Sequence, residues 1–112
     1  MSMIVELPLR LESVANLREH WACKARRVKS HRMAALAIPP HTLPCVVTLT
    51  RIAPRRLDDD NLRGACKGLR DGIADRLGVK DNDPRVEWRY EQTRSARPKH
   101  YAVLVQIDRS DP

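Results

Sequence analysis

The stretch from residue 45 to residue 77 most constrains the fold, because it changes from a strand period to a helix period across a run of aspartates. Residues 45–53, "CVVTLTRIA", alternate and are rich in β-branched side chains, which predicts a strand. Apolar residues then recur at helical spacing, which predicts an amphipathic helix over about 61–77 closed by a Gly78 cap. The apolar residues of this helix are Leu62, Ala65, Cys66, Leu69, Ile73 and Leu77.

A strand and a helix are expected before this stretch. Residues 3–11 predict a strand in which Pro8 marks a kink or an edge. Residues 12–37 predict a long helix, which the prolines at 39 and 40 end. The buried stripe expected on this helix consists of Leu17, Trp21, Ala25 and Val28.

Two β-rich segments close the chain. Residues 85–93 and 100–108 predict strands, and the polar loop between them suits a hairpin, so these strands are expected to be adjacent and antiparallel. The predicted order is β-α-β-α-β-β in a single α+β domain over residues 1–112. Its two helices are expected to pack on a mixed, mainly antiparallel sheet.

Composition excludes several classes of protein. The 112 residues suffice for one domain with a modest core. No run approaches the roughly 18 apolar residues of a membrane span, and the first residues do not resemble a signal peptide, so the cytoplasm is the default location. Three widely spaced cysteines argue against a disulfide framework and exclude a zinc ribbon. His20 and Cys23 could share a helix face, but no second pair accompanies them to hold a metal.

The net charge of +7 is unevenly distributed along the chain. Residues 1–57 hold ten Lys/Arg and three Asp/Glu, a net of +7, whereas residues 58–112 hold eleven of each. Seven of the later acids lie between Asp58 and Asp83. A basic half beside an acidic focus suits a polyanion held around a cation and favours contact with nucleic acid.

The candidate phosphate contacts are bases of the first helix, of the segment before the second helix and of the second helix's first turn. A solvated helix face is the alternative explanation for those on the first helix, which also carries Arg32. The candidate nucleic-acid-binding residues are Arg18, Lys24, Arg26, Arg27, Lys29, Arg55, Arg56 and Arg63.

Three adjacent aspartates, Asp58 to Asp60, repel one another and need an offsetting positive charge. In extended chain, Asp58 and Asp60 would point the same way, and the helix that begins beside them, with Asn61 or Asp60 as its N-cap, could relieve one carboxylate. Asp81, just beyond the far end of the helix, could complete an oxygen site for Mg²⁺ or Mn²⁺. An EF-hand is excluded because its sixth and twelfth positions would be Arg63 and Leu69. Capping with solvated acids remains the alternative.

Lys67 lies on the predicted helix after the acids. It could form an i, i+4 pair with Asp71, which would contribute only about 0.3 kcal/mol. It could instead reach a scissile phosphate or a leaving oxygen and offset charge there.

With these motifs in view, the chain resembles the RusA family of endodeoxyribonucleases, the phage-type Holliday junction resolvases. The resemblance runs through most of the chain and is most specific in "LDDDNL", "KGLRDGIADRLGV" and "KDNDPRVEWRYEQ", all within residues 57–92. The family's Asp-x-Asp-Asn maps onto Asp58, Asp60 and Asn61, its lysine onto Lys67, and its third aspartate onto Asp81. The family commonly has two adjacent aspartates at that last place, whereas this chain has Lys80 and Asp81, with Asn82 and Asp83 as alternatives for the role.

The resemblance implies a homodimer that depends on Mg²⁺ and cuts four-way DNA junctions symmetrically. Asp58, Asp60 and Asp81 would hold the metal that activates water, and Lys67 would stabilise charge on the phosphate. Branched DNA is the expected partner, with no membrane and no organic cofactor. Two alternatives stay open: a catalytically inactive RusA-like DNA-binding protein, and a domain whose basic helix meets an acidic protein.

Overall fold

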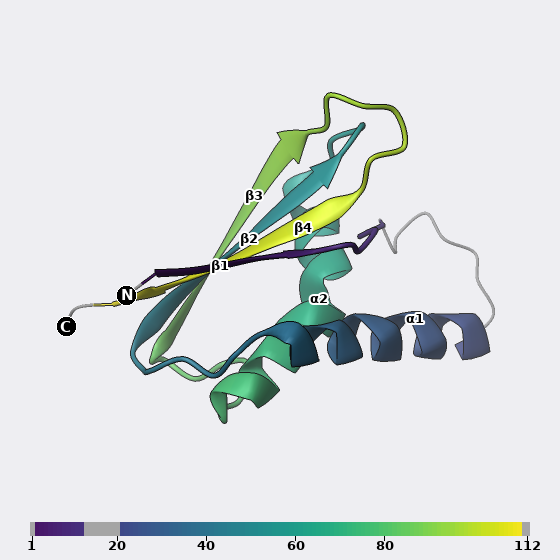
Figure 1. The fold of residues 1–112 in the computed structure, drawn as a ribbon. Helices are drawn as coiled ribbons and strands as arrows, with labels where there is room; N and C mark the ends of the chain where they lie inside the picture. Colours follow the sequence, from purple (N-terminus) through teal and green to yellow (C-terminus); the bar gives the residue numbers. More distant parts are fainter. Residues whose placement is uncertain (1, 13–20, 111–112) are drawn as a thin grey trace.

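The computed structural model describes residues 2–12 and 21–110, and the side chains of residues 21 and 23 are outside that description. Four strands, two α-helices and one short 3₁₀ helix make a single α+β domain (Figure 1). None of the helices in these ranges is long and apolar enough to cross a membrane. In chain order the elements are β1 (Ser2–Leu7), α1 (Trp21–Ala34), the 3₁₀ helix Ala35–Ala37, β2 (Cys45–Ala53), α2 (Asp59–Leu77), β3 (Val86–Arg94) and β4 (Ala102–Arg109).

The four strands form one mixed sheet in the order β1-β4-β2-β3. The pairs β1–β4 and β4–β2 are antiparallel, whereas β2–β3 is parallel. The expected α+β class, with two helices and a mixed sheet, is confirmed. The parallel pair is possible because α2 is the crossover between β2 and β3, and parallel neighbours need a connection of this length.

The expected hairpin between the last two strands is wrong. β2 lies between β3 and β4, so the loop over residues 95–101 passes across the end of β2 instead of joining neighbours. The physical reason lies in the side chains. β4 is mostly buried and takes a central position, whereas β3 alternates with charged residues and suits an edge.

One face of the sheet carries the core. Alternate residues of β2, from Cys45 through Val47 to Leu49, face α2 together with Val105 and Ile107 of β4. The six apolar residues predicted for α2 are all buried, as the amphipathic pattern indicated. Gly78 ends the helix in the left-handed conformation, with φ of 74°, and its N–H donates to the Asp75 carbonyl.

Helix α1 packs against α2 through two glycines. A Cβ at Gly72 would lie 2.5 Å from the Arg32 carbonyl oxygen, and one at Gly68 would lie 3.1 Å from the His31 Cβ. Glycine at position 72 therefore allows α1 to cross α2 this closely. The crossing of the two helices is seen in Figure 1. His31 is buried at this crossing, and burial, with the charge of Arg27, lowers its pKa.

The stripe predicted for the first helix is wrong where it can be compared. Ala25 and Val28 are exposed, and the buried residues that follow them are His31 and Ala35. Leu17 lies outside the described residues, as does the Trp21 side chain. The spacing of apolar residues predicts the wrong buried face because α1 packs against glycines of α2. At this contact the backbone, and not large side chains, meets the other helix.

Candidate functional site

The three aspartates begin α2. Asp58 is the N-cap, with Oδ1 accepting from the Asn61 backbone N–H at 2.9 Å and Oδ2 from the Asn61 Nδ2 at 3.0 Å. Asp59 and Asp60 occupy the first turn, where the positive end of the helix dipole stabilises negative charge. The helix terminus therefore offsets part of the repulsion among these acids.

Two predictions about this cluster are wrong in detail. Asp58 caps the helix, not Asn61 or Asp60, and the helix starts two residues earlier than expected. Since Asp59 and Asp60 are helical, successive carboxylates are about 100° apart around the axis instead of alternating as in a strand. All three side chains lie at one exposed helix end.

Asp81 is not brought to this cluster. Its backbone carbonyl accepts from Arg70 Nη2 at 2.7 Å and from Trp88 Nε1 at 3.1 Å, and its Oδ2 lies 3.9 Å from Arg70 Nε. Arg70 is ten residues beyond Asp60 on α2, about 15 Å along the axis. The turn that carries Asp81 is thus clamped to the middle of the helix.

The Arg70 clamp also involves two aromatic rings of β3. The guanidinium carbon lies 4.7 Å from the centre of the Trp88 ring, and Nη1 donates to the Tyr90 hydroxyl at 2.7 Å. The Arg70 Nε is buried and has no hydrogen-bond partner among the described residues. This arrangement gives Asp81 a structural partner of opposite charge.

The two alternatives to Asp81 differ in their surroundings. Asp83 binds Arg85 through both carboxylate oxygens, at 3.1 Å and 2.9 Å, and these hydrogen bonds lower the pKa of Asp83 to about 2. Asn82 is exposed. In the described residues no group of three or more His, Cys, Asp or Glu side chains converges as a metal site.

A three-carboxylate metal site therefore does not form within one chain over those ranges. The donors at the start of α2 fit a different arrangement, since Mg²⁺ in proteins is usually held by one or two carboxylates together with substrate phosphates and water. Asp58 and Asp60 are the carboxylates that would take part in it.

Lys67 is exposed on α2, seven residues after Asp60 and so on the same side of the helix. The separation along the axis is about 10 Å. Over the described ranges it forms no ion pair with Asp71. The structure therefore leaves the Lys67 ammonium available on the side of α2 that carries Asp60.

The candidate bases of α1 lie on its surface. Lys24, Arg26 and Lys29 are exposed, Arg27 is half-buried, and Arg18 lies outside the described residues. Arg32 is bound to α2, with Nε 2.8 Å from Oδ2 of Asp75. Arg63, on α2, lies over the Tyr90 ring with its guanidinium carbon 5.7 Å from the ring centre.

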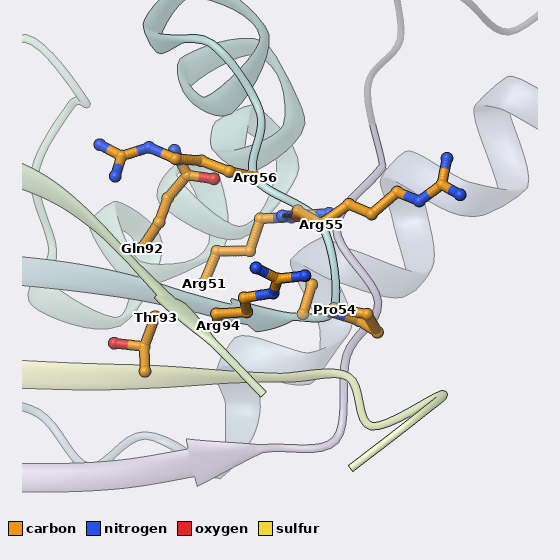
Figure 2. Close-up of a pocket in the computed structure, with 8 residues that line it drawn as sticks. Arg51, Pro54, Arg55, Arg56, Gln92, Thr93 and Arg94 are labelled. Carbon is orange, nitrogen blue, oxygen red and sulfur yellow. Dashed lines mark hydrogen bonds between the residues drawn. The ribbon is translucent and has the colours of Figure 1, made fainter. Parts of the chain in front are cut away.

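A concave pocket lies at the carboxyl ends of β2 and β3 (Figure 2). It has a volume of about 470 Å³ and includes four arginines, which we call the arginine pocket: Arg51, Arg55, Arg56 and Arg94. Its other lining residues are Ala53, Pro54, Gln92 and Thr93, so no Asp or Glu is among the described residues that line it. Figure 2 shows Arg55 and Arg56 extending away from each other on opposite sides of the pocket.

Arg51 is the buried member of the pocket. It continues the inward row of Cys45, Val47 and Leu49 on β2, and only 7% of it is exposed. Its Nε donates to the Leu11 carbonyl at 2.9 Å and its Nη1 to the Arg55 carbonyl at 2.6 Å. Burial lowers the pKa of this guanidinium, because a charge is disfavoured away from water.

Gln92 joins the arginine pocket to the acidic helix end. Its Oε1 accepts from the Leu57 N–H at 2.8 Å and its Nε2 donates to the Leu57 carbonyl at 2.7 Å. Leu57 immediately precedes Asp58 and follows Arg56. This double hydrogen bond fixes the segment that carries both the arginines and the capping aspartate.

Arg51, Gln92 and Arg94 were not among the predicted site residues. Gln92 is the register partner of Arg51, and Arg94 that of Ala53, so the pocket depends on parallel pairing of strands far apart in sequence. One signal was present in the sequence. Arg51 stands at an inward position of an alternating strand, and a charge there is uncommon unless it has a role.

Comparison of the sequence with models of known protein families gives no match, and no curated protein matches it.

Proposed function

We propose that this protein is a Mg²⁺-dependent, structure-selective DNA endonuclease that resolves four-way junctions by symmetric phosphodiester hydrolysis. The observation that carries the proposal is the Gln92 bridge, which holds an arginine pocket directly beside three aspartates at a helix terminus. The arginines supply the positive charge that a DNA strand requires, and the aspartates supply oxygen ligands for a hard cation.

The residues have separate parts in this proposal. Asp58 and Asp60 would hold Mg²⁺ or Mn²⁺, which when bound supplies an activated water and neutralises charge on the phosphate. Arg55 and Arg56 orient the strand through its phosphates, and Lys67 offsets negative charge along α2. The bases of α1 extend the contact without reading sequence.

The proposal also has to account for the third acidic position, Asp81. Asp81 is held by Arg70 away from Asp58 and Asp60 within the chain. A DNA phosphate, water or a second chain of the proposed homodimer would therefore complete the coordination. A two-fold dimer also presents two sites with the symmetry that paired cuts in opposed strands need. The resemblance to the RusA family and a cytoplasmic location are part of the same proposal.

A synthetic four-way junction with labelled strands tests the activity. Cleavage is expected with Mg²⁺ or Mn²⁺, not with EDTA, and Asp60→Asn is expected to reduce the rate at least about 100-fold while junction binding persists. Asp75→Asn, which changes an acid on the same helix outside the cluster, is the matched control. Absence of cleavage under every divalent metal would reject the enzyme.

A catalytically inactive DNA-binding protein is the second candidate. The observation that favours it is the ion pair between Arg70 and Asp81, which gives that carboxylate a structural role. Salt-sensitive junction binding that is the same in EDTA and in Mg²⁺, without cleavage, would select this candidate. Measurable cleavage that requires Asp58 and Asp60 would eliminate it.

A further inference from the structure

The arginine pocket contains more positive charge than the described part of the chain neutralises. Arg55, Arg56 and Arg94 form no ion pair with any described acid. The charge of Glu12 acts on Arg51 only weakly, and Glu12 is itself paired with Arg10. Four arginines line one pocket without an Asp or Glu among its described lining residues, so a bound anion would stabilise this region.

Arg51 strengthens this conclusion because it is buried. Its two hydrogen bonds go to neutral carbonyls of Leu11 and Arg55, and none of the described acids forms an ion pair with it. A buried charge without an ion-pair partner is costly. The same hydrogen bonds hold the guanidinium at a fixed place in the pocket wall. A fixed charge with exposed arginines around it is suited to a compact, highly charged group.

The concentration of positive charge in the pocket favours the end of a strand over its middle. An internal phosphodiester carries one negative charge, and its strand must leave on both sides. A phosphomonoester carries a charge of about −1.5 to −2 at pH 7 and three strong acceptor oxygens. It can enter a concave site end-on, where it can meet guanidiniums from β2, β3 and the connecting segment together.

We infer that the arginine pocket binds a terminal phosphate of a DNA strand, with Arg51 and Arg94 as its principal partners and Arg55 and Arg56 at its rim. This inference deepens the proposed function, on which it rests for the nature of the ligand. It implies that branched DNA with a phosphorylated strand end near the branch is preferred over the same DNA ending in hydroxyls.

Two short single-stranded oligonucleotides of identical sequence test it, one with a 5′-phosphate and one with a 5′-hydroxyl, alongside the same pair at the 3′ end. Binding of the protein without divalent metal is measured by fluorescence anisotropy at fixed salt. At one of the two ends, the phosphorylated strand is expected to bind at least about tenfold more tightly. Equal affinity of the phosphate and hydroxyl forms at both ends would overturn the inference.

Arg94→Gln should abolish that preference, and Arg89→Gln should retain it. Both residues lie on β3, but Arg89 is on the opposite face and is paired with Glu87. Arg94 is exposed, so its replacement leaves the core unchanged. A preference that survives Arg94→Gln would also overturn the assignment. This binding assay requires neither metal nor cleavage. Its result can therefore be told apart from the result of the cleavage assay, even if the protein does not cut DNA.

Discussion

The two ends of β2 use the same row of inward positions in opposite ways. At the amino end the row is Cys45, Val47 and Leu49, all fully buried against apolar side chains of α2 and β4. At the carboxyl end the next inward residue is Arg51, and arginines replace the apolar neighbours.

The two ends of β2 also differ in whether the arginines beside them are paired with acids. Beside the amino ends of β2 and β3, Arg85 is paired with Asp83. At the carboxyl ends, Arg55, Arg56 and Arg94 have no such partner among the described residues. The comparison indicates that one end of the strand stabilises the fold, whereas the other retains unbalanced charge for a ligand.

The largest loss of stability is expected for a substitution at the apolar, amino end of β2. Leu49→Ala should lower the free energy of unfolding by about 3 kcal/mol, because it leaves a cavity at a fully buried site. Urea unfolding followed by circular dichroism measures this. Thr48→Ala changes the preceding residue, which lies on the opposite face of the sheet, and is the control; it should change stability by less than about 1 kcal/mol. Equal losses for the two variants would contradict the assigned role of the row.

The helix crossing above that row should be nearly as sensitive. In Gly72→Ala the new Cβ would meet the Arg32 carbonyl and the Ala35 Cβ at 2.5 Å and 2.8 Å, so we expect a loss of about 2 kcal/mol. Gly68→Ala meets its nearest atoms at 3.1 Å, and the gain in helix propensity of about 1 kcal/mol offsets much of its cost. The order of the two unfolding midpoints is the test, and a reversed order would contradict this packing.

At the charged end, stability and activity should separate at Asp58. Asp58→Ala removes the N-cap and should cost about 1 kcal/mol, whereas Asp58→Ser retains a capping oxygen and should cost only a few tenths. Both variants lose the carboxylate, so both should lose junction cleavage if the proposed function holds. Urea unfolding and the cleavage assay are run on the same preparations. If Asp58→Ser cleaved junctions at the full rate, the Asp58 carboxylate would have only a structural role.

The smallest effect is expected for the ion pair between Asp83 and Arg85. The folded pKa of Asp83, about 2, lies below its ordinary value, so the stability that its ion pair contributes is complete above about pH 4 and is lost as the pH falls through about 2. Carboxyl-carbon NMR should follow this titration directly. Arg85→Gln should return the Asp83 pKa towards about 3.9. A titration unaffected by that change would show that Arg85 is not the cause.

Local sequence patterns predicted much of the fold. Local hydrophobic periodicity and turn residues predict the period of α2, its Gly78 cap and the bounds of β2. The pattern failed for α1, where two glycines on another helix define the contact. It also failed for the order of β3 and β4, because adjacency in sequence does not determine which strand has the more apolar faces.

For the candidate site, the sequence by itself determined the acids, their place at a helix start and an excess of basic charge. Only the tertiary structure decided that Asp81 turns towards Arg70, and that Arg51, Gln92 and Arg94 gather beside Asp58. The reason is physical. Helix and strand periods depend on near neighbours in the chain, whereas a pocket at the ends of two parallel strands requires a register set by the crossover and by core packing.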